Sequence, residues 1–403
     1  MKTTIHNPAN EIQDLQFFGE FGGVNPSISD SSTYTFLTAQ AMSDTFEGKT
    51  EGCYLYSRHS SPSNMYLATA LAKMENTEAA HVTASGMAAI TAVIMQLCHS
   101  GSHVVSSRTI YGGTYAFLKN MAQKYGINTS FVDITKLETV EAAITPNTKI
   151  IYCETVSNPL LEVADLNGLS ALCKKYNLKL IVDNTFTPLL ITPTKFGADV
   201  VIHSLTKYIN GSSDCVGGVI CGTEKFINEL KDVNDGSCML LGATMDSLRA
   251  ASILKNLRTL PIRIKQHSYN ANYLANTFKN DGIKVVYPGL QNHPSHEIFI
   301  SLLNEEYGNG GMLTIDVGSK ENANMVMQSM QDNNVGYLAV SLGFYKTLFS
   351  APGSSTSSEI PAEEQIEMGL SDGLIRFSIG LDHDIKRTNQ IIMKCIEETL
   401  ITT

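Results

Sequence analysis

The sequence predicts an α/β protein with a mostly parallel sheet covered by helices on both faces, followed by a smaller α+β domain. Apolar strand-like runs alternate with helical patterns from about residue 60 to residue 225, as in parallel βα units. Residues 200–202 are consecutive and β-branched, which is typical of a strand buried on both faces. After Pro261 the strand and helix signals become shorter and mixed. A chain of 403 residues is also too long for one ordinary core.

These patterns divide the chain into an N-terminal arm over residues 1–60, a large domain over 61–259 and a small domain over 260–403. The arm shows little periodicity and is rich in Gly, Ser and Asn. Because such a segment cannot bury a core of its own, it either stays loose or lies across another surface.

The composition narrows the possible partners and the compartment. A net charge of −10 argues against nucleic acid or an anionic membrane as a partner. Charged residues make up 17% of the chain, below the usual ~25%, which favours extensive burial, including burial between subunits. The eight cysteines are scattered without metal-ligand spacing, so we expect reduced thiols and no metal site. The N-terminus has no apolar leader, so we expect a cytoplasmic protein.

The large domain opens with a predicted helix over 64–75 and a short strand over 81–83. Ser85, Gly86 and Met87 follow and lead into a helix that reaches residue 97. A strand, a small-residue turn and a helix N-terminus together aim backbone N–H groups at an anion, and Gly86 would let a phosphate approach closely. The alternative is a plain helix start, since helices often begin at Ser-Gly.

The rest of the large domain repeats this alternation. Further strands are predicted over 103–105, 127–132, 149–154, 178–183 and 219–220. Helices are predicted from Tyr111-Gly112-Gly113 through residue 121, over 139–144, over 166–176 and over about 224–275. The small domain is expected to contain strands over 283–287, 311–317 and 374–379, a helix near 323–330 and a final C-terminal helix.

Lys207 and Asp183 each follow a predicted buried strand. Because the two strands are successive and parallel, both side chains should lie at the same sheet edge, where ligands of open α/β folds bind. A lysine beside the hydroxyls of Ser204 and Thr206 suits an aldehyde cofactor that carries a phosphate. Asp183 would then pair with a pyridinium nitrogen. The alternatives are a solvent-facing lysine and a carboxylate that caps the next turn.

Two arginines offer further anion contacts. Arg376 lies between Ile375 and Phe377 in an apolar strand, where it needs an acid, either a substrate carboxylate or an internal partner. Tyr56 and Arg58 are two apart in an extended segment and therefore point the same way, as a phosphate site would require. Without further context, a tyrosine and an arginine at this spacing are more often surface residues that bind no phosphate.

Together these segments resemble one family, the pyridoxal-phosphate enzymes of cysteine and methionine metabolism. The resemblance covers nearly the whole chain and rests on Tyr56-Ser57-Arg58, Ser85-Gly86-Met87, Tyr111-Gly112-Gly113-Thr114, Val182-Asp183-Asn184-Thr185, His203-Ser204-Leu205-Thr206-Lys207-Tyr208 and Arg376-Phe377-Ser378-Ile379-Gly380. Within the family the chain looks most like plant-type methionine γ-lyases, through Phe18-Gly19-Glu20, Gly22-Gly23-Val24-Asn25, Tyr56-Ser57-Arg58-His59 and the serine-rich segment 353–359.

The resemblance implies the PLP-dependent transferase fold of type I and pyridoxal 5'-phosphate as cofactor. It also implies that Lys207 forms a Schiff base with the aldehyde and later moves protons. Asp183 would pair with the ring nitrogen, and Asn158 would contact the phenolic oxygen. Tyr111 would stack on the ring and act as an acid toward the leaving group.

The same resemblance implies how the cofactor and the substrate are held. The phosphate would be held from one subunit by Gly86, Met87, Ser204 and Thr206, and from a neighbour by Tyr56 and Arg58. The substrate carboxylate would be held by Ser341 and Arg376. The arm would then cross to a neighbouring subunit, and the site would need at least a dimer. The family usually forms a homotetramer of two such dimers.

Two positions bear on the substrate. Val340 stands where cystathionine enzymes often place a glutamate, and it suits an apolar thioether. Gly113 stands where bacterial methionine γ-lyases carry a cysteine, as in the plant-type enzymes. The resemblance therefore implies γ-elimination of methionine and related amino acids such as homocysteine. The alternatives are a cystathionine γ-lyase or γ-synthase, an O-acetylhomoserine sulfhydrylase, or a catalytically silent cofactor-binding protein.

Overall fold

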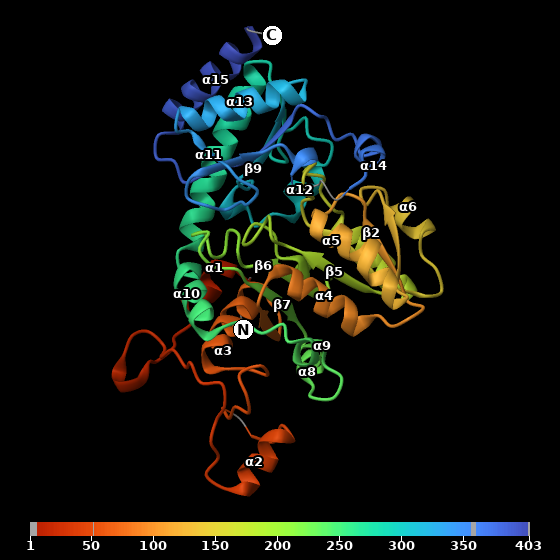
Figure 1. Ribbon diagram of the computed structural model, residues 1–403, viewed down its shortest axis with the longest axis vertical. Coiled ribbons are helices and arrows are strands. Elements are labelled where there is room, and N and C mark those ends of the chain that lie inside the picture. Colours follow the sequence, from red (N-terminus) through yellow and green to blue (C-terminus); the bar gives the residue numbers. More distant parts are fainter. Residues whose placement is uncertain (1–5, 51, 356–359, 402–403) are drawn as a thin grey trace.

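The computed structural model describes residues 6–50, 52–355 and 360–401 (Figure 1). Within these ranges the strands form a seven-stranded sheet in the order β1-β7-β6-β5-β4-β2-β3 and a five-stranded sheet in the order β10-β11-β12-β9-β8. Figure 1 shows the small sheet with its helices above the large one. The predicted division into a large α/β part and a smaller α+β part is therefore confirmed as a fold class.

The large sheet is parallel from β6 to β3, and β7 runs antiparallel to both β6 and β1. Its strands are β1 (Ala79–Thr83), β2 (His103–Ser107), β3 (Asn128–Val132), β4 (Thr148–Glu154), β5 (Lys179–Asp183), β6 (Val200–Ser204) and β7 (Gly218–Gly222). Alternate residues face two separate cores: Ile151, Val182 and Val201 enter one, and Ile150, Ile181 and Ile202 enter the other. Burial on both faces explains why these strands are continuous apolar runs.

Helices cover both faces of this sheet. They are α3 (Pro62–Met74), α4 (Gly86–Leu97), α5 (Gly112–Ala116), α6 (Leu137–Ala142), α7 (Leu166–Tyr176), α8 (Glu224–Lys231), α9 (Ser237–Leu241) and α10 (Ser247–Leu257). Leu67 and Leu71 of α3 pack into the first core, and Ile90 and Val93 of α4 pack into the second. The parallel strands therefore end at one common edge, between these two helical layers.

The arm contains regular structure that the sequence did not predict. Helices α1 (Pro8–Gln13) and α2 (Ala39–Phe46) begin at caps, where the Asn7 and Thr38 side chains accept backbone N–H bonds. Such short helices depend on capping rather than on apolar periodicity, so a periodicity test overlooks them. The arm also contains a short 3-10 helix, Glu20–Gly22, and a turn over residues 57–59, and Phe21 and Leu37 are fully exposed.

The small domain is joined to the large one by the long helix α11 (Leu260–Asn280), which begins at the predicted boundary. Pro261 fits its first turn, where no intrahelical N–H bond is needed. The start of α11 packs into the large-domain core, and residues from Ala271 onward pack into the small-domain core. Helix α11 therefore belongs to both hydrophobic units.

The rest of the small domain is a mixed sheet with flanking helices. Its elements are β8 (Lys284–Val286), α12 (His296–Leu302), β9 (Met312–Asp316), α13 (Lys320–Asp332), β10 (Gly336–Leu338), β11 (Thr347–Ser350), α14 (Ala362–Glu367), β12 (Leu374–Ser378) and α15 (Ile385–Ile401). The sequence did not predict α12, β11 or α14. Residues 356–359 of the serine-rich segment lie outside the described residues. Within the described ranges, no helix is both long enough and apolar enough to cross a bilayer.

Candidate active site

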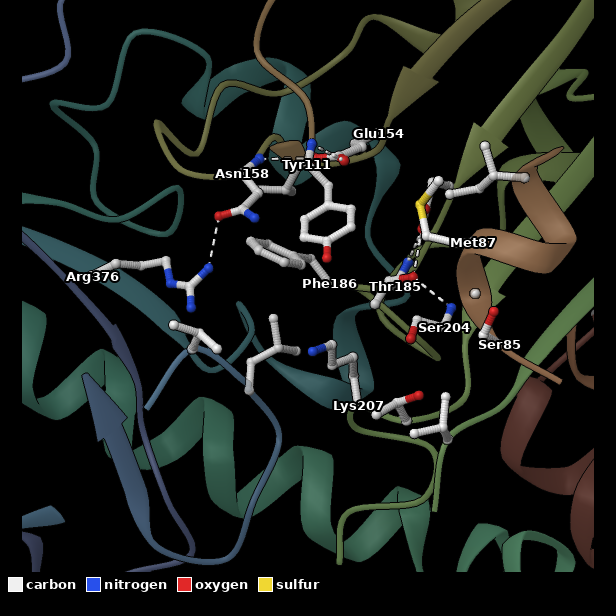
Figure 2. Close-up of a pocket in the computed structure, with 18 residues that line it drawn as sticks. Ser85, Met87, Tyr111, Glu154, Asn158, Thr185, Phe186, Ser204, Lys207 and Arg376 are labelled. Carbon is white, nitrogen blue, oxygen red and sulfur yellow. Dashed lines mark hydrogen bonds between the residues drawn. The ribbon is translucent and has the colours of Figure 1, made fainter. Parts of the chain in front are cut away.

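A cavity of about 240 Å³ opens at the carboxyl edge of the large sheet and also touches the small domain. Figure 2 shows the Tyr111 ring, the Lys207 amine and the Arg376 guanidinium directed into this space. Ten of the residues selected from the sequence line it: Gly86, Met87, Tyr111, Asn158, Asp183, Ser204, Thr206, Lys207, Val340 and Arg376. The structure thus brings together residues that span almost 300 positions of the chain.

Lys207 lies in the turn after β6, and its Nζ atom is 3.2 Å from the Ser341 hydroxyl. Burial and the positive charge of Arg376 lower the pKa of the Lys207 amine to about 8. A larger fraction of the amine is therefore neutral near pH 7 than for a free lysine, whose pKa is about 10.4. A neutral amine is the form that attacks a carbonyl.

Asp183 ends β5, directly beside β6, so it shares the sheet edge with Lys207 as predicted. One carboxylate oxygen accepts bonds from the Thr185 N–H at 3.0 Å and the Thr185 hydroxyl at 2.5 Å. Burial raises the pKa of Asp183, and the Thr185 bonds oppose this shift. The carboxylate thus caps the next turn and lines the cavity, so the two interpretations of its role are compatible.

Arg376 is 2% exposed on β12. Its Nη1 donates to the Asn158 side-chain oxygen at 2.8 Å, and its Nη2 lies 3.4 Å from the Ser341 carbonyl oxygen. Among the described residues no carboxylate lies within ion-pair distance, and its Nε has no partner. A buried guanidinium without an internal acid fits an anionic ligand better than an internal salt bridge.

Glu154 is a site residue that the sequence analysis missed. It ends β4 and pairs in register with Asp183 of β5. Its two carboxylate oxygens accept the backbone N–H groups of Tyr111 at 2.8 Å and Asn158 at 2.9 Å. Burial and the nearby Asp183 carboxylate raise the pKa of Glu154. The available signal was the one used for Asp183, namely a carboxylate that ends a buried strand.

The start of α4 forms a cradle for an anion, because Ser85 and Gly86 line the cavity there. Ser85 caps this helix, and Gly86 packs so tightly that an added Cβ would lie 2.8 Å from the Ser204 Cβ. The hydroxyls of Ser204 and Thr206 line the same cavity. A helix N-terminus with nearby hydroxyl donors is a common anion site.

Tyr111 precedes α5, and its ring is 43% exposed at the cavity. Gly113 does not line the cavity but lies against this ring: an added Cβ would come within 2.6 Å of the Tyr111 Cε1 atom. Val340 lines the cavity from the small domain and is 60% exposed. A larger residue at 113 would therefore act on the tyrosine and not directly on a ligand.

Tyr56 and Arg58 are not brought to the cavity of their own chain. The Arg58 Nη1 donates to the Met239 carbonyl at 2.8 Å, and the guanidinium lies 5.6 Å from the Tyr56 ring centroid. Neither residue lines the cavity. A role for this pair at a phosphate therefore requires a neighbouring subunit and stays a prediction.

The family model for Cys/Met metabolism PLP-dependent enzymes matches residues 9–387. The chain belongs to this family. It is 43% identical to a methionine γ-lyase from Arabidopsis thaliana, over 93% of this chain and 86% of that protein. It is 39% identical to a cystathionine γ-lyase from Bacillus subtilis, over 82% of this chain and 85% of that protein. A solved structure of cystathionine γ-synthase from Xanthomonas oryzae pv. oryzae, in complex with aminoacrylate and cysteine, superposes on this chain with a TM-score of 0.89. The two sequences are 29% identical, and the superposition covers 99% of this chain and 100% of the synthase chain.

This family uses pyridoxal phosphate, and the cavity fits that group. It offers an amine of lowered pKa, a buried carboxylate, a glycine cradle with two hydroxyls and a buried arginine without an acid. Lys207 would hold the aldehyde, Asp183 would face the ring nitrogen, and Gly86, Met87, Ser204 and Thr206 would surround the phosphate. Metal ligation needs a different arrangement, and within the described residues no group of three or more His, Cys, Asp or Glu side chains could hold a metal ion.

The lowered pKa of Lys207 predicts how the apoenzyme captures its cofactor. The rate should rise about tenfold per pH unit below pH 8 and level off above it, because only the neutral amine attacks the aldehyde. Stopped-flow absorbance after mixing the apoenzyme with pyridoxal phosphate measures this rate. A rate that is constant between pH 6 and pH 8 would contradict a partly neutral Lys207.

Proposed function

We propose that the protein is a carbon–sulfur lyase that converts L-methionine and water into methanethiol, 2-oxobutanoate and ammonia, and that acts in the same way on related amino acids such as homocysteine, which would release hydrogen sulfide. The observation that supports this proposal most strongly is the buried guanidinium of Arg376, which forms no ion pair with a carboxylate in the described ranges and shares one cavity with the Lys207 amine and an apolar wall. Val216, Val340 and Leu342 supply that wall. Such a site fits an amino acid with an uncharged, apolar side chain, and the identity to a methionine γ-lyase supports the same substrate.

Each polar group in the cavity has a task in this reaction. Bound pyridoxal phosphate supplies an electron sink for charge that develops beside the substrate amine. Arg376 binds the α-carboxylate, and the Lys207 amine takes the Cα proton. Loss of a Cβ proton then lets the γ-thiolate leave, and one water releases 2-oxobutanoate and ammonia. Asp183 would favour a positive charge on the ring nitrogen of the bound cofactor. Tyr111 donates a proton to the departing thiolate, since its side chain is directed into the same space.

Two other functions remain candidates. In a transferase, the same first half-reaction would act on an O-acylated homoserine, and sulfide or cysteine would then add in place of the departing carboxylate. A catalytically silent cofactor-binding protein is the other class, but it has no need for Lys207, Asp183, Tyr111 and Arg376 together.

Formation of 2-oxobutanoate tests these functions against one another. The holoenzyme is assayed with methionine, homocysteine, cystathionine and O-acetylhomoserine, the last with and without sulfide. We expect the highest kcat/KM with methionine or homocysteine, together with release of a thiol. Faster homocysteine synthesis from O-acetylhomoserine plus sulfide would contradict the lyase assignment, and no turnover of any substrate would indicate a silent protein.

We further propose that the active site is shared between subunits of a homotetramer. The arm exposes Phe21, Val24 and Leu37 almost fully, as a segment that packs on a second copy would. Arg58 lies outside the cavity of its own chain and would reach the phosphate of a neighbour.

Subunit mixing tests this sharing. Arg58→Ala and Lys207→Ala proteins should each be nearly inactive. In mixed dimers, one of the two sites combines an intact Lys207 with an intact Arg58. A one-to-one mixture that is unfolded and refolded together should therefore recover about a quarter of wild-type activity. If the mixture recovers no activity although each variant alone assembles into the normal oligomer, the shared site would be contradicted.

A further inference from the structure

We propose that Glu154 is a positioning residue that holds Tyr111 and Asn158 in place, and so links the arginine that binds the substrate carboxylate to the tyrosine that donates the proton. This inference rests on the proposed function for the roles of Arg376 and Tyr111. The contacts of Glu154 carry it, and they involve residues from both domains (Figure 2).

Glu154 bridges two segments that are separate in the sequence. One oxygen accepts the N–H of Tyr111, in the connection between β2 and α5. The other oxygen accepts the N–H of Asn158, in the connection after β4. Because both bonds are to backbone, Glu154 fixes the course of each segment, and the ring of Tyr111 follows from that course. A single carboxylate therefore sets the spacing between two walls of the cavity.

The contacts continue into the small domain through Asn158. Its side-chain oxygen accepts a bond from Arg376 on β12, and the guanidinium also reaches the Ser341 carbonyl. A carboxylate that binds Arg376 must share the guanidinium with Asn158, and Asn158 cannot shift without straining its bond to Glu154. Binding at Arg376 and the position of Tyr111 are therefore coupled through a continuous set of hydrogen bonds.

The location of Glu154 is costly for a residue with a purely structural task. It is buried beside Asp183, so two carboxylates stand at neighbouring strand ends. Both oxygens are used by backbone donors that belong to the cavity. Burial and Asp183 raise the pKa of Glu154, and these two backbone bonds and the charge of Arg376 oppose that rise. A neutral side chain of the same shape can accept at only one of these two N–H groups, because its amide nitrogen is a donor.

The first test is Glu154→Gln, compared per bound cofactor with wild type. We expect the visible absorbance of the holoenzyme to be retained and kcat for methionine to fall about 100-fold, since a displacement of about 1 Å in a reacting group has this effect. L-Norleucine, which has an α-carboxylate but no γ-leaving group, should bind about tenfold more weakly in a spectral titration. Glu162→Gln is the matched control: Glu162 accepts the Thr109 hydroxyl near the same segment but does not line the cavity. Its kcat and norleucine affinity should stay within about threefold of wild type.

A double-mutant cycle tests whether Glu154 acts through Tyr111. Tyr111→Phe keeps the ring and removes the proton donor. If Glu154 only positions that donor, Glu154→Gln in the Tyr111→Phe background should lower kcat by less than about tenfold, against about 100-fold in wild type. Equal factors in both backgrounds, or an unchanged kcat and norleucine affinity in Glu154→Gln, would overturn the proposal.

Glu154→Asp provides a second variant, because it keeps the charge but is too short to reach both N–H groups. If both variants lose the fold or the cofactor, Glu154 serves the fold and the positioning proposal is wrong. The norleucine titration needs no turnover. Failure of wild type to convert methionine would therefore contradict the proposed function, while the coupling between Glu154 and the carboxylate site would still be measured.

Discussion

A Lys207→Ala protein is expected to lose γ-elimination activity by about 10⁴-fold or more and to lack the visible absorbance of the holoenzyme. The reason is that one amine has two tasks, holding the aldehyde and moving the Cα proton, and proton transfer alone contributes about 10²–10⁴-fold. The Lys207 amine contacts the Ser341 hydroxyl at 3.2 Å. Its removal should therefore leave the fold intact, which thermal unfolding of the apo forms can check.

Lys195→Ala is the matched control for this variant. Burial lowers the pKa of Lys195 too, but its amine contacts the His6 carbonyl and the Asn304 side chain, away from the cavity. The control should keep full absorbance and turnover. A Lys207→Ala protein that still forms 2-oxobutanoate from methionine within about tenfold of wild type would remove Lys207 from the reaction.

Asp183→Asn should lower kcat by about 10²–10⁴-fold while the fold and Lys207 stay in place. Removing one partner of a buried ion pair costs about 3–5 kcal/mol, which corresponds to about that factor in rate. Asparagine can keep the side-chain oxygen that accepts both Thr185 bonds, so the turn after β5 should survive. Steady-state kinetics and the thermal midpoint, measured on the same preparation, separate the loss of charge from a loss of structure.

The chain offers a close control in Asp133→Asn. Asp133 also accepts the N–H and hydroxyl of the threonine two residues later, at 3.1 and 2.6 Å, but it faces Arg108 and Lys136 at the edge of the sheet. Its kcat should be close to that of wild type. If Asp133→Asn and Asp183→Asn lowered kcat equally, the effect would come from the turn and not from a charge facing the cofactor.

The mostly parallel sheet and the common edge of Asp183 and Lys207 could be predicted because both depend on local pattern. β-Branched runs indicate strands buried on both faces, and successive parallel strands place their ends together. Glu154 was missed although it ends a strand in the same way, because its partners are backbone N–H groups that no side-chain pattern reveals. The partner of Arg376 was likewise left open, because Asn158 approaches it from another domain.

The arm shows a second limit of sequence patterns. Its helices α1 and α2 are short and start at caps, so no periodicity marks them. The expected extended segment at Tyr56 and Arg58 is wrong, because the chain turns over residues 57–59, where the His59 N–H donates to the Tyr56 carbonyl. A single chain also does not place the pair at the cavity. Sequence spacing describes neighbours within one element and cannot place a residue relative to another subunit.

Covalent capture of the cofactor tests the central claim most directly. The holoenzyme is reduced with borohydride, digested and mapped by mass spectrometry, which locates the lysine that carries the pyridoxyl phosphate. We predict one modified peptide, with the label on Lys207. As a blank, the Asp183→Asn apoenzyme reduced without added cofactor should carry no label. A label on any other lysine, with Lys207 unmodified, would contradict the assignment of this cavity as the active site.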